Sequence, residues 1–351
     1  MHKSLLKVGF YKVSGLFIIL VDNIYGRLGE DSMMKRPLII DTDPGIDDAM
    51  MLTVACANQD IFDIRLVTTV AGNISQSKAN YNAHAYLQYI GEDIEIARGL
   101  EKPLIRPLEV AEEIHGEYGF GKVEFPAITV PTNVRPAVDA MRETILASKE
   151  KVTIVATGPL TNVAALLLAH PEVKNNIETI SWMGGAVKGG NKTAVAEFNA
   201  YVDPHAAQIV MQSGVPMSMC GLDVTHKAFV TQQEAKKLLE IGTEFAQKAY
   251  DLVTFYLDVA NPTPFSEPHY SEVMRFHDVS AVMFLMHPEY FKGTDYYVEM
   301  STEGITAGAT VVDLHNSTGK QPNVHVLHDV DREAFVKIFI DAVQTISDRL
   351  S

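Results

Sequence analysis

The chain has very little cysteine, with only Cys56 and Cys220 among 351 residues. Each lies among apolar or small residues, so we expect two buried free thiols in a reducing compartment rather than a disulfide framework. No apolar run reaches the roughly 18–20 residues of a membrane-spanning helix. The sequence therefore argues against a disulfide-stapled scaffold and against a membrane protein.

Basic residues are also scarce relative to acidic ones. The 29 Lys and Arg residues against 44 Asp and Glu residues give a formal net charge of −15 at pH 7. No basic block interrupts this excess of negative charge. Such a surface argues against binding to nucleic acid or to an anionic membrane.

The N-terminal segment differs from the rest of the chain. A short apolar run at 15–21 is similar to the hydrophobic region of a weak signal peptide, but Asp22 follows at once and no clear small-residue cleavage site comes after it. We expect residues 1–33 to be an extension outside the core fold and residues 34–351 to form a single domain. A cytoplasmic location follows, with export by the extension as the minor alternative.

Short apolar runs typical of buried strands alternate with helical patterns through most of the chain. Strands are expected at 37–42, 64–70, 94–97, 152–156, 177–183 and 215–219, with helices at 48–58, 76–90, 137–150, 160–169 and 205–212. This alternation predicts an α/β fold with a mostly parallel, Rossmann-like central sheet and helices on both faces. Right-handed crossovers would place the carboxyl ends of the strands along one edge, where α/β enzymes hold their sites.

The C-terminal third has a different pattern. Helices are expected at 232–239, 243–259 and 279–286, and short strands at 296–300, 310–313 and 324–327. In the last segment, 332–350, apolar residues recur at spacings of three and four, which predicts an amphipathic helix. We expect this third to be an α-helical embellishment of the same domain.

Carboxylates are concentrated at the end of the first predicted strand. Asp41, Asp43, Asp47 and Asp48 surround the turn Pro44-Gly45, and strand alternation would send Asp41 and Asp43 to the same side. Capping of the following helix could explain one or two of these acids, at about 0.3–1 kcal/mol each. It does not explain all four.

Such a cluster needs compensation for its charge. Two unit charges about 4 Å apart repel by roughly 4 kcal/mol at an effective dielectric near 20. The cluster persists if it binds a cation, retains protons, or directs its carboxylates apart. Because the nearby donors are oxygens, with no Cys or His close in sequence, calcium and magnesium are the candidate cations.

The segment Asp-Thr-Asp-Pro-Gly-Ile-Asp-Asp at 41–48 resembles the signature of the inosine–uridine-preferring nucleoside hydrolases, which cleave N-ribosyl bonds. Any one such segment is weak, but further segments follow in family order at 69–73, 114–117, 156–162, 182–185, 195–199, 221–226 and 276–278. The resemblance extends from about Arg36 to near the C-terminus. It implies an enzyme that hydrolyses small ribonucleosides, uses calcium, and forms a homotetramer or homodimer.

The resemblance also implies a metal site and a catalytic base. Asp43, Asp48, the backbone carbonyl of Thr157 and Asp278 would hold the calcium ion. The calcium-bound water would be the nucleophile, with Asp43 as its general base.

Substrate contacts are implied in the same way. The residues expected to bind the ribose hydroxyls are Asp47, Asn73, Asn191, Glu197 and Asn199, and Met183 would line the sugar pocket. His277 would face the nucleobase, with His115 approaching it from a glycine-rich loop, and a histidine with a near-neutral pKa suits protonation or solvation of the departing base. Simpler interpretations stay open: a core histidine at 277, a solvated loop histidine at 115, and a solvated edge strand at 197–199.

Base preference is less well defined. Residues 243–272 should form the wall and lid around the base, but they do not align residue by residue with the family. The single tryptophan, Trp182, argues against the purine-specific subgroup that sandwiches bases between indoles. We therefore expect a pyrimidine or mixed preference.

The chain departs from the family pattern at one position after His277 and Asp278. Val279 stands where many relatives have proline.

Two other classes of protein share part of this pattern. A haloacid-dehalogenase-like magnesium phosphatase would use Asp41 as nucleophile, but it expects Thr or Val where this chain has Gly45. A non-catalytic nucleoside-binding protein would keep the pocket and lack the base. The intact Asp43 and Asp48 argue against that second alternative.

Overall fold

The computed structural model describes residues 8–13, 16–21, 35–129, 135–259 and 273–351, and the statements below refer to these residues. The chain divides into two compact units, Met1–Met34 and Lys35–Ser351. In the first unit, β1 (Val8–Val13) and β2 (Leu16–Val21) form an antiparallel pair, so the apolar run at 15–21 is largely a strand. The role of residues 1–33 as an extension stays a prediction.

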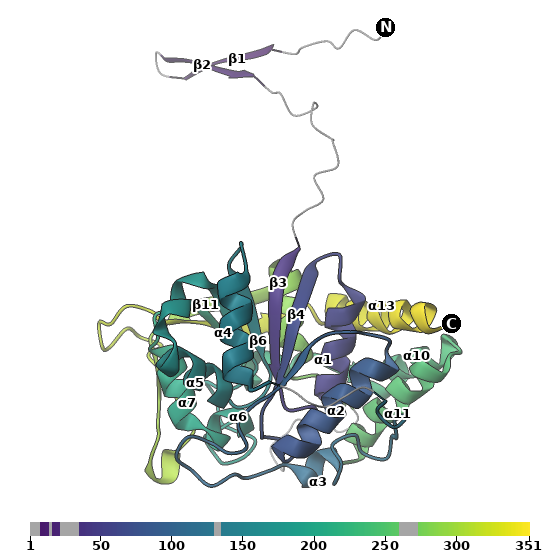
Figure 1. Cartoon of the computed structure of the whole chain (residues 1–351). Helices are drawn as coiled ribbons and strands as arrows, with labels where there is room; N and C mark the ends of the chain where they lie inside the picture. The colour runs from purple at the N-terminus through teal and green to yellow at the C-terminus, as the bar shows by residue number, and fades with distance from the viewer. Residues whose placement is uncertain (1–7, 14–15, 22–34, 130–134, 260–272) are drawn as a thin grey trace, which may run out of the picture. The chain divides into compact units, whose positions relative to one another are not determined.

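The second unit is built on an eight-stranded sheet in the order β11-β14-β8-β7-β6-β3-β4-β5 (Figure 1). Every neighbouring pair is parallel except β11 and β14, which form the antiparallel edge. The strands are β3 (Arg36–Thr42), β4 (Phe62–Thr69), β5 (Ile96–Arg98), β6 (Val152–Ala156), β7 (Ile177–Trp182), β8 (Met217–Met219), β11 (Phe291–Tyr296) and β14 (Val324–Val330).

Helices cover both faces of this sheet. The strand β3 shows this directly, because Leu38 and Ile40 belong to one buried cluster and Ile39 belongs to the other. The first cluster contains α1 (Ile46–Ala57), α2 (Gln76–Tyr89), α11 (Glu244–Val259), α12 (Val279–Met286) and α13 (Arg332–Leu350); the second contains α4 (Ala137–Ala147), α5 (Thr161–Ala169) and α7 (Pro204–Met211). A sheet buried on both faces explains the continuous apolar runs of its central strands and confirms the predicted fold class.

Short elements complete the unit. They are α3 (Glu112–His115), α6 (Phe198–Val202), α8 (Leu222–Thr225), α9 (Gln232–Ala235), α10 (Lys237–Glu240), the pairs β9 (Phe229–Thr231) with β10 (Val273–Arg275) and β12 (Val298–Met300) with β13 (Thr310–Val312), and the 3₁₀ turns Pro171–Asn176, Pro288–Tyr290 and Gly304–Thr306. The predicted helix at 232–239 is thus two short helices.

The C-terminal third contains helices and also contributes two strands, β11 and β14, to the central sheet. The predicted strand at 296–300 covers only the last residue of β11 together with β12, because β11 begins at Phe291. This edge strand pairs with β14 alone among the described strands, and three of its residues, Lys292, Thr294 and Asp295, are exposed. An edge strand of this kind lacks the apolar run by which the central strands are predicted.

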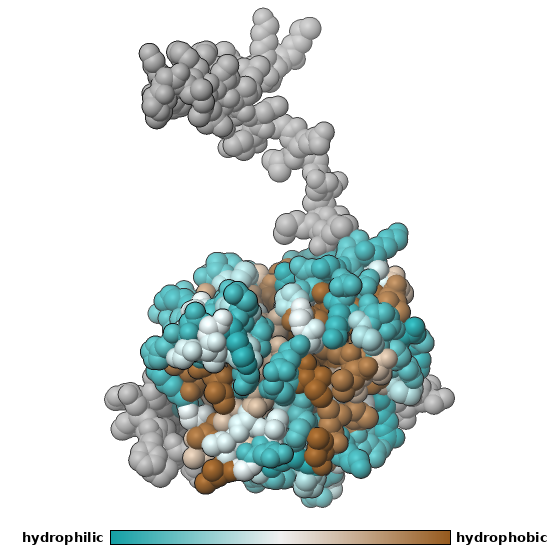
Figure 2. Space-filling view, turned by 90° about the vertical axis from the view of Figure 1, so that its left-hand side faces the viewer, coloured by the Kyte–Doolittle hydropathy of each residue, from teal (hydrophilic) through white to brown (hydrophobic). Residues whose placement is uncertain are grey.

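The surface of the second unit is mixed in character. On the face shown in Figure 2, hydrophobic areas are interspersed with hydrophilic ones. Ile305 and Ile105 are among the large exposed apolar residues of the unit as a whole. Cys56 and Cys220 are both buried and free, as expected. None of the helices in the described part of the chain is both long and apolar enough to cross a membrane.

Candidate active site

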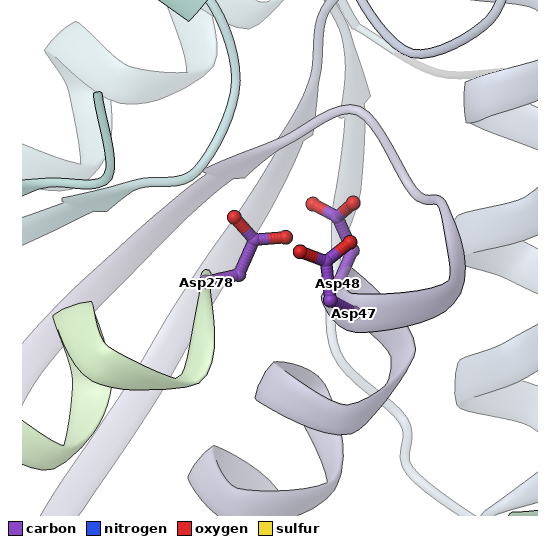
Figure 3. Close-up of side chains that lie close together, drawn as sticks. All are labelled: Asp47, Asp48 and Asp278. Carbon is purple, nitrogen blue, oxygen red and sulfur yellow. The ribbon is translucent and has the colours of Figure 1, made fainter. Parts of the chain in front are cut away.

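Polar side chains meet at the carboxyl edge of the parallel sheet. Asp43 follows β3, Asn73 follows β4, Thr157 follows β6 and Met183 follows β7, and these four strands are parallel neighbours. Asp278, at the start of α12, approaches the same place from a distant part of the sequence (Figure 3). The sheet topology therefore gathers residues that the sequence separates widely.

Three buried aspartates form a close group at this edge of the sheet. Asp47, Asp48 and Asp278 each offer a carboxylate oxygen, and these oxygens lie within 4.8 Å of one another. Figure 3 shows their side chains pointing toward each other, and each residue is at most 5% exposed. The group includes Asp47, which the resemblance assigns to the ribose. Asp43, which the resemblance assigns to the metal, lies beside the group.

Asp48 has four hydrogen-bond donors around its two oxygens. Thr42 Oγ1 and Thr157 Oγ1 donate to Oδ1, the latter at 2.9 Å. The backbone N–H of Gly45 and the amide of Asn73 donate to Oδ2 at 2.9 and 3.1 Å. Asp48 therefore caps its own helix, as the capping interpretation proposed, and also joins three strand ends at the site.

Asp43 is held by the segment that follows β4. The backbone N–H of Asn73 donates to Asp43 Oδ2 at 2.6 Å, and the Asn73 amide reaches the Asp43 carbonyl at 3.3 Å. Gly72 permits this approach, because a Cβ there would lie 2.0 Å from Asp43 Oδ2. Asn73 is 7% exposed and thus more than a turn former.

Two buried carboxylate oxygens around this group have no hydrogen-bond partner: Asp43 Oδ1 and Asp278 Oδ2. Burial, together with the charges of neighbouring aspartates, raises the pKa of Asp43, Asp47 and Asp278. Unpaired buried carboxylate oxygens are costly without a cation or a proton. An all-oxygen donor set with two unpaired members fits a hard divalent cation.

Asp41 is not part of this group. It is fully buried, and it accepts hydrogen bonds on Oδ1 from Thr68 Oγ1 at 2.6 Å and from the Asn162 amide at 2.7 Å. Strand alternation does not relate it to Asp43, because β3 ends at Thr42. Burial raises the pKa of Asp41 to about 6. This enclosed position is unsuited to the phosphatase nucleophile of the alternative interpretation.

The residues expected at the ribose lie in two different environments. Glu197 is 2% exposed and caps α6, with both oxygens bound by backbone N–H groups, those of Asn199, Ala200 and Gly185 at 2.9–3.0 Å. Burial raises its pKa to about 7. Asn191 is exposed, and its side-chain oxygen accepts from the backbone N–H of Phe198 at 2.9 Å. The edge-strand interpretation is wrong, because this stretch is a buried helix start.

Asn199 lies at the centre of the sugar side of the site. Its amide donates to the carbonyls of Thr157 at 2.8 Å and Met183 at 3.1 Å, and Met183 Sδ is 3.6 Å away. Its side-chain oxygen is buried and has no partner. An unpaired acceptor beside the metal-ligand candidate Thr157 is suited to receive a substrate hydroxyl.

The two predicted histidines come from different elements. His277 is half-buried, and its Nδ1 lies 2.7 Å from Thr225 Oγ1, which lies at the end of α8. Burial, followed by the nearby His226 and Arg275, lowers the pKa of His277 well below its usual range. The near-neutral pKa expected for this imidazole is therefore not found, and the ring is uncharged at pH 7.

His115 ends α3 and is 5% exposed, so it is not a solvated loop residue. Its Nδ1 accepts from the backbone N–H of Ile46 at 3.2 Å. Burial also lowers its pKa, against the opposing charges of Asp48 and Glu113. In a neutral ring whose Nδ1 accepts, Nε2 carries the hydrogen, so His115 can donate but does not titrate near neutral pH.

Comparison with known proteins decides the family. Residues 38–337 match the family model described as inosine-uridine preferring nucleoside hydrolase. The chain belongs to this family. It is 40% identical over 311 residues to the pyrimidine-specific ribonucleoside hydrolase RihA of Photobacterium profundum, covering 88% of this chain and 98% of that protein. It is also 40% identical over 318 residues to RihA of Escherichia coli K12, covering 89% and 99%.

Solved structures agree with this assignment. A purine-preferring ribonucleoside hydrolase from Gardnerella vaginalis superimposes with a TM-score of 0.82 at 29% identity, covering 90% of this chain and 100% of that one. The chain is thus a nucleoside hydrolase, an N-glycosidase.

Some residues of this nucleoside hydrolase site were not identified from the sequence. Thr42 binds Asp48, Thr225 binds His277, and Asn82 of α2 donates to the carbonyl of Pro44 at 3.0 Å. Asn82 does carry a signal, since it is a polar residue on the buried side of a helix beside Ala83 and Tyr86. That signal indicates a buried hydrogen bond but does not name its partner.

Proposed function

We propose that this nucleoside hydrolase cleaves the N-glycosidic bond of ribonucleosides to free base and ribose, with a pyrimidine or mixed preference and with Asp43 as the general base. The observation that carries this proposal is the buried group of aspartates with unpaired oxygens on Asp43 and Asp278. Paired carboxylates suit a reaction whose transition state resembles an oxocarbenium ion.

Asp43, Asp48, Asp278 and the Thr157 carbonyl would hold a calcium ion, which when bound lowers the pKa of a coordinated water and orients the ribose hydroxyls. Asp43 would accept the proton of the attacking water through its unpaired Oδ1. Asp47 and Asn73, together with Asn199 and its unpaired Oδ1, would bind the sugar hydroxyls. Glu197 would fix the start of α6, which carries Asn199. The sugar contacts serve every ribonucleoside alike.

Departure of the base would be assisted by hydrogen bonds rather than by a charged acid. Both His277 and His115 are neutral at pH 7 because burial lowers the pKa of each. A neutral imidazole still offers one N–H to the negative charge that develops on the leaving base. We assign that donation to His277, with His115 sharing it.

Removal of the metal is expected to abolish activity without unfolding the protein. The fold rests on two large buried clusters that do not include the aspartates, whereas the reaction needs the cation. After exhaustive chelation verified by metal analysis, we expect at least about a 10²-fold loss in kcat, with thermal unfolding still cooperative. Addition of Ca²⁺ should restore activity better than addition of Mg²⁺. Full activity in metal-free protein would refute the metal assignment.

2′-Deoxynucleosides are expected to be poor substrates. Loss of the 2′-hydroxyl would leave Asp47 and the cation with an unfilled contact in a buried site. We expect kcat/KM for 2′-deoxyuridine to be lower than for uridine by about 10²-fold or more. Comparable turnover of the two nucleosides would contradict this assignment of the ribose site.

Base preference can be measured with a nucleoside panel. RihA from both bacteria is described as pyrimidine-specific, and this chain shares 40% identity with each. We expect uridine and cytidine to be cleaved at least as well as inosine. Turnover restricted to purine nucleosides would overturn this preference.

We further propose that the enzyme works in the cytoplasm as a homo-oligomer, either a homodimer or a homotetramer. The two buried free cysteines support the first part, because disulfides are rare in a reducing compartment. Light scattering of the full-length protein would test the second part.

A further inference from the structure

One buried side chain joins the two segments that carry the aspartates and the loop histidine. We name residues 43–48 the aspartate turn and residues 112–121 the histidine loop. Asn82 of α2 is 5% exposed, and its amide donates to the carbonyl of Pro44 at 3.0 Å and to that of Tyr118 at 2.8 Å. A carboxamide has two N–H donors, so one hydrogen can serve each segment.

The backbone of the histidine loop is shaped to meet this amide. Gly119 has φ +92°, and a Cβ at that position would lie 2.6 Å from the Asn82 amide nitrogen and 3.1 Å from the Pro44 carbonyl. No side chain fits there without moving one of the two partners. The contact between loop, helix and turn therefore depends on a glycine at 119.

A second contact joins the same two segments next to the chemistry. The Ile46 N–H donates to His115 Nδ1 at 3.2 Å, and a Cβ on Gly45 would lie 2.5 Å from that nitrogen. The imidazole is thus packed directly against the aspartate turn. Small movements of the histidine loop would change the position of His115 relative to Asp47 and Asp48.

A second polar side-chain link between α2 and the histidine loop lies further out, in addition to the ring contact between Tyr86 and Phe120. Lys78, four residues before Asn82, is ion-paired with Glu112 at 2.8 Å and donates to the Glu117 carbonyl at 2.6 Å. The side chains of this ion pair are 31% and 40% exposed. Lys78 binds the loop to the helix, but only Asn82, of these two residues, also reaches the aspartate turn.

From these contacts we propose that Asn82 is a positioning residue for the hydrolysis, holding His115 in place against the aspartate turn so that its Nε2–H meets the departing base. This inference rests on the leaving-group role of His115 in the proposed function. Because a displacement of about 1 Å in a catalytic group can cost 10²-fold in rate, loss of the two donors should be visible in turnover.

The test uses the full-length, calcium-loaded enzyme with two substrates. Asn82→Leu keeps roughly the same volume and removes both donors. We expect kcat for uridine to fall by about 10- to 100-fold and kcat for p-nitrophenyl riboside, which has a good leaving group, to change by less than about 3-fold. Should the Leu variant not fold, Asn82→Asp replaces the donors with a carboxylate of the same shape.

The matched control is Asn80→Leu on the same helix. Asn80 is 9% exposed, and its side-chain oxygen accepts from Thr69 Oγ1 at 3.4 Å, away from the histidine loop. This variant measures the general cost of losing a buried amide from α2. We expect it to affect the two substrates equally.

Two further measurements separate this inference from the proposed function. His115→Ala should show the same preference for the good leaving group, and adding Asn82→Leu to it should slow uridine by no more than about 3-fold, since both changes act through one residue. Hydrogen–deuterium exchange at 112–121 should be faster in Asn82→Leu than in Asn80→Leu. The inference alone fails if His115→Ala slows uridine selectively but Asn82→Leu slows both substrates equally. It also fails if Asn82→Leu leaves hydrogen exchange in the loop unchanged. If His115→Ala slows uridine and p-nitrophenyl riboside equally, both the leaving-group role of His115 and the inference are rejected.

Discussion

Asp43→Asn is expected to lower kcat for uridine by about 10²–10⁴-fold or more. The amide cannot accept the proton of the attacking water, and the substitution also removes one ligand charge from the buried group. The Asn side-chain oxygen can still accept from the Asn73 N–H, which binds Asp43 at 2.6 Å, so the local fold should survive. Steady-state kinetics with metal analysis of the same sample measure both effects.

The matched control for that variant is Asp41→Asn. Asp41 lies two residues earlier and is equally buried, but its hydrogen bonds go to Thr68 and Asn162 rather than to the site. An Asn oxygen can accept both bonds, so we expect a loss of less than about 10-fold. Near-normal activity in Asp43→Asn, or equal losses in the two variants, would place the general base elsewhere.

His277→Ala is expected to slow natural nucleosides by about 10²–10⁴-fold while scarcely affecting p-nitrophenyl riboside. The sugar, cation and water contacts are common to both substrates, so only assistance to the leaving group separates them. Burial keeps His277 neutral near pH 7. We therefore expect the rate loss caused by His277→Ala to be the same at all pH values near 7. Parallel kinetics on uridine and p-nitrophenyl riboside measure the difference.

The competing explanation for His277 is a structural one. It adjoins Asp278, so an imidazole that only holds the start of α12 would disturb the metal site, and both substrates should then slow together. His226→Ala supplies the control, because this exposed neighbour lies with its ring centre 5.9 Å from that of His277. We expect it to change either rate by less than about 10-fold.

The central strands were predictable because each is buried on both faces. In β3, Leu38, Ile39 and Ile40 are all fully buried, and such continuous apolar runs identify parallel strands without an alignment. The edge strand β11 was largely missed, since it is half-exposed and its register depends on β14. Prediction from one sequence therefore weakens toward the edge of the sheet.

The site was predictable where its functional side chains lie close together in the sequence. Asp47 and Asp48 are adjacent in sequence, but Asp278 reaches them only because α12 packs beside α1, and the resemblance rather than the spacing pointed to it. The hydrogen bonds of Thr225 and Asn82 were not predictable, because each depends on the meeting of distant loops. The same is true of the histidine pKa values, which are determined by burial in the folded protein.

The most direct test of the account is the product analysis of uridine incubated with the calcium-loaded enzyme in phosphate-free buffer. The account predicts uracil and free ribose in equal amounts, with the oxygen of the solvent at C1 of the ribose when the reaction is run in ¹⁸O-labelled water. A phosphatase would release phosphate from phosphomonoesters and leave uridine intact, and a binding protein would bind uridine without turnover. Absence of free ribose from uridine, cytidine and inosine alike would contradict the account.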